Sequence, residues 1–440
     1  MNCKKNFGAL RGNRVAIFIF LLFFLPAYLV KMIRRGGYGE KFGQRLGIYD
    51  YEVCVRLAKQ ESTWLHAVSV GEVNVALKLA KALQALEPDL RCVLTTTTTT
   101  GFALANKNAP AWIEVMYAPL DYWPIMRRTF AVIRPTRIVL VEAEVWPNLV
   151  ALAHERRIPT ILVNARLSPR SERRFRRFRF FVAPTFRLLD LVCAQEPDDV
   201  DRWVAIGVAR DRIRAVGSIK YDPNGHDQTA EAQENARTTS VSNADQQRPV
   251  LFGGSTHRGE EEILARVFLR LRQQFSSLRL FIAPRHVERL REIRAQLAAL
   301  PLRVAVASEV AVGRELDADC TLLDTTGELQ RWYGIATIVF VGKSLTAQGG
   351  QNPAEPIMAG KPVVFGPHME NFATLAKALV LKKGAVQIGD VDSLEMTIAG
   401  LLRDSGARQR LLENARDVLS KHYGATARTA ALIHELHLGL

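Results

Sequence analysis

The chain has 440 residues, 48% of them hydrophobic and 23% charged, so it has a globular composition and is too long for one ordinary core. The formal net charge of +15 favours anionic partners, but no helix-turn-helix, zinc-finger or RNA-binding signature accompanies it, so we expect no nucleic-acid partner. The five cysteines are scattered without metal-ligand spacing, which favours reduced thiols over disulfides or a metal centre.

An uncharged apolar run, Val15–Val30, lies near the N-terminus with basic residues on both sides. It is slightly shorter than the ~20 residues that a perpendicular span needs, and Pro26 would kink a helix there. No small-residue cleavage site follows, which argues against a cleaved signal peptide. We therefore expect residues 1–35 to form a membrane anchor that either spans the bilayer or lies in its interface. Basic residues directly after the run favour a cytoplasmic main body.

From residue 63 onward, strand-like apolar runs alternate with amphipathic helical stretches, of which Val73–Leu86 is the clearest. Such alternation predicts a parallel sheet covered by helices on both faces. The predicted strands of the first half are Trp64–Val70, Cys92–Thr97, Glu114–Ala118, Arg137–Glu142, Thr160–Asn164, Leu191–Ala194 and Ile213–Val216.

The polar stretch Asn224–Arg248 interrupts this pattern and predicts a linker or surface loop. A second series follows it, with predicted strands at Val250–Phe252, Leu278–Ala283, Arg303–Ala307, Cys320–Leu323, Thr337–Val341, Pro362–Phe365 and Ala385–Ile388. The sequence therefore predicts an α/β fold of two Rossmann-like doubly wound domains, over residues 36–222 and 249–440, joined by a linker over 223–248. Ligands bind such sheets at the carboxyl ends of the strands, so we expect the strand-end motifs of both halves to face one cleft.

Carboxylates follow two predicted strands of the first half. Glu72 comes directly after Trp64–Val70 at the start of a helix, and Glu142 and Glu144 end the strand that begins at Arg137. An acid at a helix N-terminus is stabilised by the helix dipole by about 0.3–1 kcal/mol, which explains Glu72 without catalysis. The other interpretation is a general base, whose pKa burial or a second acid would have to raise. Both interpretations remain open for Glu72 and Glu142.

A run of six threonines, Thr95–Thr100, ends another predicted strand. Its hydroxyls could bind a sugar or a phosphate. A strand edge followed by a helix cap explains the run equally well.

Residues 164–187 contain eight arginines, and Phe175, Phe178 and Phe181 recur about every three residues. This spacing predicts a helix over 170–181 with the phenylalanines on one face. A solvated helix with a packed Phe stripe is one interpretation, and a helix that binds a membrane surface or phosphates is the other, which accounts for both residue types.

Three strand-end motifs of the second half predict a nucleotide pocket: Gly253–His257, Pro284–His286 and Asp324–Leu329. They supply Ser255, Thr256, Arg285, His286, Gly327 and Glu328 as candidate donor-binding residues. No P-loop is present, and no Gly-x-Gly-x-x-Gly follows the first strand of either half, which argues against ATPases and dehydrogenases.

The most informative stretch runs over residues 342–370 and contains a strand end, the pair Gly349-Gly350, a helix start and a second strand. Glycines let a backbone approach a ligand closely, and the first-turn amides of a helix point at what lies before it. Glu355 could accept two ribose hydroxyls. The stretch predicts a sugar-nucleotide pocket, although a βα turn of any parallel α/β protein has similar features.

Over about residues 36–425 the chain resembles the 3-deoxy-D-manno-octulosonic acid (Kdo) transferases of lipid A assembly. The motifs that carry the resemblance are WLHAVSVGE (64–72), TTTTTTG (95–101), PLDY (119–122), VEAEVWPNL (141–149), ILVNARLSPRS (161–171), GGSTHRGEE (253–261), PRH (284–286), DTTGEL (324–329), GGQNPAEP (349–356) and GKPVVFGPHMENF (360–372).

The resemblance implies a two-domain glycosyltransferase fold of the B type, anchored by its N-terminus to the inner membrane. It implies CMP-Kdo as the donor, a lipid A precursor as the acceptor, inversion at the anomeric carbon, and neither a catalytic metal nor a cofactor. The family's catalytic base falls on Glu72, and a second essential acid falls on Glu142. The family's nucleotide contacts fall on Ser255, Arg285, Gly327, Gly350, Asn352 and Glu355. We expect Gly349 to contact the donor as well, and we expect acceptor contacts at Ser69, Gly71, Arg166, Arg173 and Arg177.

The chain departs from the family pattern at two positions: Gln351 stands where His is usual, and Lys343 stands where Gly is commoner. Other functions also fit parts of the pattern. A sugar-nucleotide epimerase shares the fold but needs no anchor. Another membrane-bound nucleotide-sugar transferase would share both fold and anchor, and a non-catalytic lipid A-binding protein would be expected to lack the acids.

Overall fold

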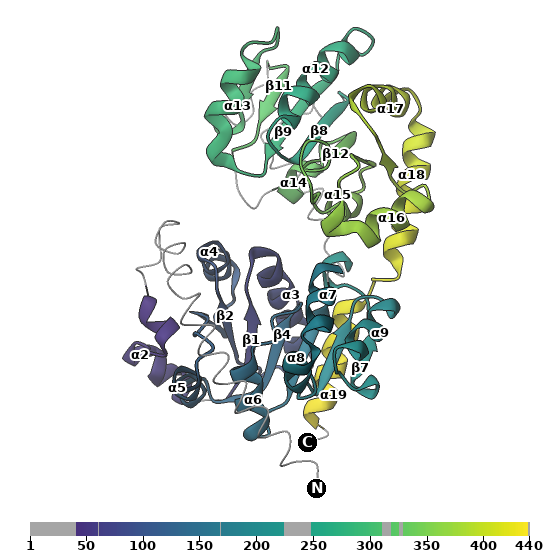
Figure 1. Cartoon of the computed structure of the whole chain (residues 1–440). Helices are drawn as coiled ribbons and strands as arrows, with labels where there is room; N and C mark the ends of the chain where they lie inside the picture. The colour runs from purple at the N-terminus through teal and green to yellow at the C-terminus, as the bar shows by residue number, and fades with distance from the viewer. Residues whose placement is uncertain are drawn as a thin grey trace. The chain divides into compact units, whose positions relative to one another are not determined.

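The computed structural model describes residues 41–59, 61–167, 169–223, 248–309, 318–324 and 329–438 (Figure 1). The chain divides into two compact units, the first comprising residues 1–222 with 422–440 and the second residues 223–421. Figure 1 shows the strands of each unit lying between helices.

The first unit is built on a seven-stranded sheet of order β3-β2-β1-β4-β5-β6-β7 in which every pairing is parallel. Its strands are β1 (Ser62–Ala67), β2 (Cys92–Thr96), β3 (Ile113–Tyr117), β4 (Pro135–Val141), β5 (Thr160–Ala165), β6 (Leu191–Ala194) and β7 (Ile213–Ala215). Its helices are η1 (Phe42–Leu46), α2 (Tyr51–Ala58), α3 (Val70–Leu86), α4 (Thr99–Asn108), α5 (Trp123–Ile133), α6 (Pro147–Glu155), α7 (Pro169–Arg177), α8 (Arg179–Phe186), α9 (Pro197–Ala205), η2 (Arg210–Arg212), η3 (Ile219–Tyr221) and α19 (Ala425–Leu438).

Alternate side chains of each central strand feed two cores, one on each face of this sheet. Trp64 of β1 packs with residues of α2, α5, α6, α8 and α9, whereas its neighbour Leu65 packs with residues of α3, α4 and α19. Since both faces are covered, the central strands are apolar runs rather than alternating ones, and this is why the sequence predicted them.

The order of the first sheet reverses between β1 and β4, which are hydrogen-bonded neighbours. At such a switch point the loops that leave two adjacent strands turn to opposite faces of the sheet and leave a crevice between them. The loop after β1 carries Glu72, and the loop after β4 carries Glu142 and Glu144. The topology thus brings the three acids of the sequence analysis to one edge of the sheet.

The second unit has a parallel seven-stranded sheet of order β10-β11-β9-β8-β12-β13-β14. Its strands are β8 (Val250–Thr256), β9 (Arg279–Pro284), β10 (Val304–Val306), β11 (Cys320–Leu322), β12 (Ile338–Val341), β13 (Val363–Phe365) and β14 (Val386–Gln387). Its helices are α12 (Glu260–Arg272), η4 (Val287–Arg289), α13 (Leu290–Leu297), η5 (Ala307–Glu309), α14 (Leu329–Tyr333), α15 (Ala354–Met358), η6 (Glu370–Phe372), α16 (Ala373–Leu381), α17 (Val391–Arg403) and α18 (Ser405–Ser420).

The switch point of the second sheet lies between β8 and β12. The loops after these strands approach closely, because a Cβ on Gly342 would lie 2.4 Å from the carbonyl oxygen of Ser255. The motif Gly253–His257 and the start of the glycine-rich stretch therefore meet at one edge of the sheet.

All fourteen predicted strands are present, with ends that differ by a few residues. The boundary of the second domain is corrected, because the structure groups residues 422–440 with the first unit rather than the second. Ala430 and Ile433 of α19 are buried in the core that α3 covers. The pattern of residues 425–438 predicted a helix, but it does not say which sheet that helix covers.

The Arg- and Phe-rich stretch is also corrected, because it forms two helices, α7 and α8, that meet at Phe178, rather than one helix over 170–181. Phe175 packs inward against Phe186, with ring centroids 5.4 Å apart, whereas Phe178 and Phe181 are exposed. The three phenylalanines therefore do not share one face.

The anchor expected over residues 1–35 and most of the linker expected over 223–248 lie outside the described residues. Within the described part of the chain, no helix combines the length and apolar character that crossing a membrane requires.

Candidate functional site

Glu72 lies in the first turn of α3 and is buried, with 7% of its surface exposed. Its Oε2 accepts the backbone N–H of Val68 at 2.8 Å, and its Oε1 accepts the hydroxyl of Ser69, the N-cap residue, at 2.8 Å. The sequence Ser-x-x-Glu over 69–72 thus forms a variant of the capping box, in which a carboxylate at the third helical position closes the first turn. The side chain therefore has one fixed orientation at the carboxyl end of β1.

Burial raises the pKa of Glu72 from 4.5 to about 7, and the charges of Glu142 and Glu144 add to this effect. The hydrogen bonds from Val68 and Ser69 act in the opposite direction, but they do not outweigh the loss of solvation. The helix N-terminus alone would stabilise the anion and lower the pKa of Glu72. Burial outweighs this effect, so a position at a helix N-terminus does not prevent Glu72 from acting as a base. Glu72 is a carboxylate that can accept a proton near neutral pH.

The second acid, Glu142, follows β4 with a left-handed backbone (φ 64°) and forms an ion pair with Lys220 of η3. Glu144 accepts a hydrogen bond from Trp146 Nε1 at 3.2 Å, and burial raises its pKa. The loop after β4 thus presents one carboxylate that is paired with a cation and one that is held by an indole.

Lys220 is the residue of this site that sequence reasoning missed. Its ammonium contacts Glu142, and a Cβ on Gly71 would lie 3.7 Å from Lys220 Nζ, so the amine lies over the first turn of α3. A signal was available, because Lys220 follows the strand predicted at Ile213–Val216 and so belongs to the same sheet edge as Glu72 and Glu142.

Three hydroxyl groups of the threonine run bond to the protein itself, next to the loop that carries Glu72. Thr96 and Thr98 both donate to the carbonyl oxygen of Val68, and Thr98 also caps α4 by accepting the N–H of Gly101 at 3.1 Å. Thr95 accepts a hydrogen bond from Trp64 Nε1 at 2.8 Å. Of the two interpretations of this run, the structural one accounts for these three hydroxyls.

The residues predicted to bind an acceptor fall into two groups. Ser69 and Gly71 lie beside Glu72, where Ser69 is half-buried and Gly71 exposed. Arg166 follows β5 and is half-buried, whereas Arg173 and Arg177 lie exposed on α7.

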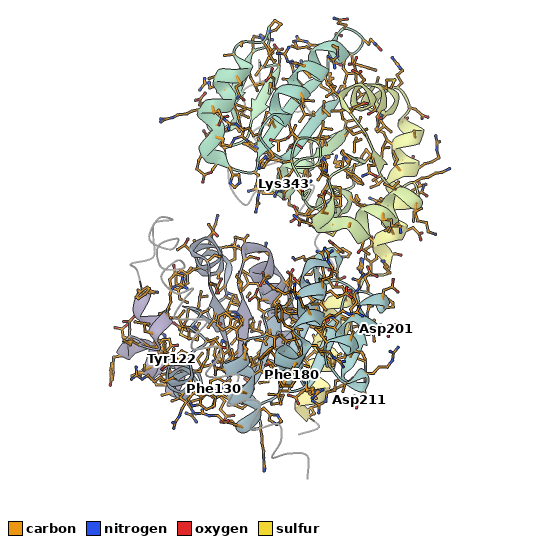
Figure 2. All side chains as sticks on the ribbon, in the orientation of Figure 1. Tyr122, Phe130, Phe180, Asp201, Asp211 and Lys343 are labelled. Carbon is orange, nitrogen blue, oxygen red and sulfur yellow. The ribbon has the colours of Figure 1, made fainter. Side chains whose placement is uncertain are left out.

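An exposed aromatic group adjoins these arginines on α8. Phe180, labelled in Figure 2, is 81% exposed, and Phe181 and Phe178 are each about half exposed, at 51% and 48%. Large aromatic side chains that stay in water next to arginines are typical of a surface that binds an amphipathic partner.

In the second unit, Ser255 and Thr256 end β8 in different environments. Ser255 is half-buried with a left-handed backbone (φ 53°), whereas Thr256 is fully buried and donates its hydroxyl to Glu261 at 3.0 Å. Arg289 forms an ion pair with the same carboxylate at 3.0 Å. The side chain of Thr256 therefore holds an internal charge pair, and its donor-binding role stays a prediction.

The loop after β12 is organised by a buried carboxylate, that of Glu260. It accepts the backbone N–H groups of His257, Lys343, Ser344 and Leu345 at 2.7 to 3.0 Å. Amide groups that cluster in this way bind anions, and here the protein supplies the anion itself. Lys343, whose side chain is labelled in Figure 2, therefore has its backbone amide engaged internally.

The pair Gly349-Gly350 adopts positive φ angles of 120° and 69°. A Cβ at Gly349 would lie 2.7 Å from Asn371 Nδ2, and one at Gly350 would lie 2.5 Å from Met369 Sδ. Both glycines are thus required by the close approach of the segment 368–371. The sequence predicted that this pair lets the backbone approach a ligand; the close approach that the structure shows is to the protein's own residues 368–371, and the ligand contact stays a prediction.

Asn352 and Glu355 lie at the start of α15, where Asn352 Oδ1 accepts the N–H of Ala354 at 3.1 Å and Asn352 Nδ2 donates to Glu355 at 3.0 Å. This helix has only five residues and contains Pro356, so it offers few free amides to a ligand. The side chains of Asn352 and Glu355 are thus bonded to each other, and that of Asn352 also to the first amide of the helix, and their donor-binding roles stay predictions.

Arg285 and His286 follow β9 and are both exposed, with the His286 ring 6.5 Å from that of His257. Gly327 and Glu328 lie outside the described residues, so their predicted contacts have no structural counterpart here. Across the residues that the structure describes, no group of three or more histidine, cysteine or carboxylate side chains is placed to hold a metal ion.

Comparison with known proteins places this geometry in a family. A family model described as 3-deoxy-D-manno-octulosonic-acid transferase (kdotransferase) matches residues 40–223. The 3-deoxy-D-manno-octulosonic acid transferase of Haemophilus influenzae is 31% identical and is covered over 94% of both chains. The enzyme of that name from Bordetella pertussis is 33% identical, over 90% of this chain and 92% of its own.

Among solved structures, a UDP-N-acetylglucosamine 2-epimerase from Neisseria meningitidis bound to UDP-GlcNAc superposes with a TM-score of 0.58 at 13% identity, over 87% of this chain and 100% of its own. That likeness shows the fold alone, two α/β domains with parallel sheets. The sequence relatives carry the function: the chain belongs to the 3-deoxy-D-manno-octulosonic acid transferase family and is a glycosyltransferase.

Proposed function

We propose that this protein transfers Kdo from CMP-Kdo to a lipid A precursor, with inversion at the anomeric carbon and with Glu72 as the general base. The observation that carries the catalytic part is the position of Glu72. It is a buried carboxylate at a sheet switch point, with a pKa of about 7 and fixed by two hydrogen bonds.

In the proposed step, the acceptor's sugar hydroxyl loses its proton to Glu72 as its oxygen bonds to the anomeric carbon of Kdo. The bond from that carbon to the phosphate oxygen breaks at the same time, and CMP leaves with the bonding electron pair. A base whose pKa lies near the working pH is best matched to this task, and such a base contributes typically about 10²–10⁴-fold.

The departing phosphate gains negative charge, which fixed donors must stabilise. We assign the donor to the second unit, where the exposed side chain of Arg285 can bind phosphate oxygens and Glu355 can accept ribose hydroxyls. Asn352 supports this assignment, because its amide already orients Glu355.

We assign the acceptor and the bilayer to the first unit. Arg173 and Arg177 on α7 suit the phosphates of a lipid A precursor, and the exposed Phe180 suits its acyl chains or the membrane surface. An N-terminal anchor in the inner membrane would keep the enzyme close to an acceptor that stays in the same membrane, which raises its effective concentration.

The test is transfer by the detergent-purified full chain, with CMP-Kdo generated in situ and tetra-acylated lipid A precursor as the acceptor. Mass spectrometry should show a product heavier by one or more Kdo units, and this count would also give the number of additions. A wild-type protein that binds CMP yet forms no product would refute the proposed acceptor.

Glu72→Gln tests the base, and Glu52→Gln is its matched control. Glu52 also lies in the first turn of a helix, α2, but it is exposed. We expect Glu72→Gln to lower kcat by about 10² or more and Glu52→Gln to leave it unchanged. Equal activity of the two variants would exclude Glu72 as the base.

A further inference from the structure

The segment over residues 218–222 follows β7 and carries Lys220. Asn164, a buried residue of β5 with a left-handed backbone (φ 51°), holds the first part of this segment. Its Oδ1 accepts the N–H of Ile219 at 3.0 Å and the hydroxyl of Ser218 at 3.2 Å. The backbone before Lys220 is therefore fixed to the sheet.

Residues at the start of α19 hold the same segment from the other side. Ser218 N–H donates to His422 Nδ1 at 3.1 Å, and the Asp222 carboxylate accepts the N–H groups of Gly424 and Thr426 at 2.7 and 2.8 Å. The backbone after Lys220 is therefore fixed as well.

Lys78 of α3 provides a third set of contacts to the segment over residues 218–222. Its ammonium donates to the carbonyl oxygens of Ile219, at 3.3 Å, and Asp222, the residues on either side of the Lys220 turn. The side chain is half-buried, and this burial lowers the pKa of Lys78, while the charge of Asp222 opposes the effect. The question is why a partly buried lysine donates to two backbone carbonyl groups of this segment rather than to a carboxylate or to solvent.

The position of Lys78 on α3 suggests the answer. This helix presents Glu72 in its first turn and Lys78 six positions later. The same element therefore carries the candidate base and the side chain that clamps the turn of Lys220, whose amine lies over Gly71 and on Glu142.

We infer that Lys78 is a positioning residue for the transferase reaction. By holding the carbonyl groups on both sides of Lys220, it keeps the Lys220 ammonium on Glu142 and over the first turn of α3, beside Glu72. Lys78 itself contacts no reacting group. This inference rests on the proposed function, because it concerns the charge environment of the proposed base.

The charged groups that act on Glu72 are Glu142 and Glu144 from the loop after β4, and Lys220 from η3 lies close by, on Glu142 and over Gly71. On the β1 side, His66 packs against Trp146 and is uncharged at neutral pH, because burial lowers its pKa to about 4. Lys220 is paired with Glu142, one of the two carboxylates whose charges raise the pKa of Glu72. When it moves away, Glu72 should ionise at higher pH, because an anion near other anions is less stable without its counter-charge.

The experiment measures kcat as a function of pH, together with Tm, for Lys78→Met, Lys220→Met and the double variant. Lys81→Met is the matched control, because Lys81 lies on the same helix but is exposed. We expect Lys78→Met to lower kcat about tenfold or more and to move the acid limb of the profile upward by about 0.5–1 pH unit. Lys78→Arg, whose guanidinium can still donate to two carbonyl groups, should restore both values in large part.

The double variant separates positioning from simple stabilisation. If Lys78 acts through Lys220, then Lys78→Met should have little further effect on kcat once Lys220 is methionine. A lysine that only stabilises the fold would lower Tm, leave the acid limb in place and add its effect to that of Lys220→Met, and this result would overturn the inference. Wild-type protein without transferase activity would instead refute the proposed function, so the two failures are distinguishable.

Discussion

Replacing Glu72 with glutamine should stabilise the protein at alkaline pH while it removes activity. The glutamine side chain has the same shape and can keep both hydrogen bonds: its oxygen accepts the Val68 N–H, and its amide donates to the Ser69 hydroxyl, which can accept as well as donate. What the substitution removes is the ability of a buried side chain to carry a charge. Activity and stability should therefore change in opposite directions.

The magnitude follows from the pKa of Glu72, which burial raises from 4.5 to about 7. One pKa unit corresponds to about 1.4 kcal/mol, so the ionised form costs the folded protein about 3 kcal/mol. Because the folded-state pKa is the higher one, the protonated side chain favours folding. Its stabilising contribution is complete below about pH 4.5 and is lost as the pH rises through about 7. Glutamine has no such loss.

The assay is thermal unfolding of wild type and Glu72→Gln between pH 4.5 and 8.5. At about 2–4 °C per kcal/mol for a unit of this size, the variant should melt about 6–12 °C higher at pH 8. The difference should shrink towards zero near pH 4.5, where both side chains are uncharged. A variant that melts lower than wild type at pH 8, or a difference that does not depend on pH, would refute the assignment of a raised pKa to Glu72.

Three further changes test other parts of the structure. Gly350→Ala should destabilise the second unit by about 1–3 kcal/mol, measured as a lower Tm, because its Cβ would lie 2.5 Å from Met369 Sδ and the backbone has φ 69°. Glu260→Ala should cost about 3 kcal/mol or more and weaken CMP binding by calorimetry, since it leaves four loop amides without their acceptor. Phe180→Ser should leave Tm within about 1 °C of wild type and reduce co-sedimentation with anionic vesicles. Unchanged co-sedimentation would refute the proposal that α8 contacts the membrane surface.

The sequence predicted the strands well, for a physical reason that the structure makes plain. Strands such as β4 are buried on both faces, so they are continuous apolar runs bounded by turns, and such runs are easy to recognise. The position of Glu72 was also predictable, because a helix that starts shortly after a parallel strand has its first turn at the sheet's carboxyl edge.

What the sequence could not supply depends on contacts between distant residues. Whether α19 covers the first or the second sheet is decided by its packing on α3, which no local pattern encodes. The role of Glu260 could not be predicted for the same reason. An acid in the first turn of a helix is usually explained by the helix dipole, and only the structure shows that the loop after β12 donates its amides to this one. The break at Phe178 has no signal in the spacing of the phenylalanines, because a period of about three fits one continuous helix as well as two consecutive ones.

The buried carboxylates at the two sheet switch points have different hydrogen-bond partners and different charged neighbours. In the second unit, Glu260 is surrounded by four amide donors and Glu261 is paired with Arg289, so both charges are satisfied within the protein. In the first unit, Glu72 has two donors, two acidic neighbours and a raised pKa. Burial leaves the Glu72 anion under-stabilised, which raises its pKa and lets it take up a proton near neutral pH. This contrast supports our proposal that the first unit supplies the base, whereas Glu260 in the second unit shapes the loops of the proposed donor site.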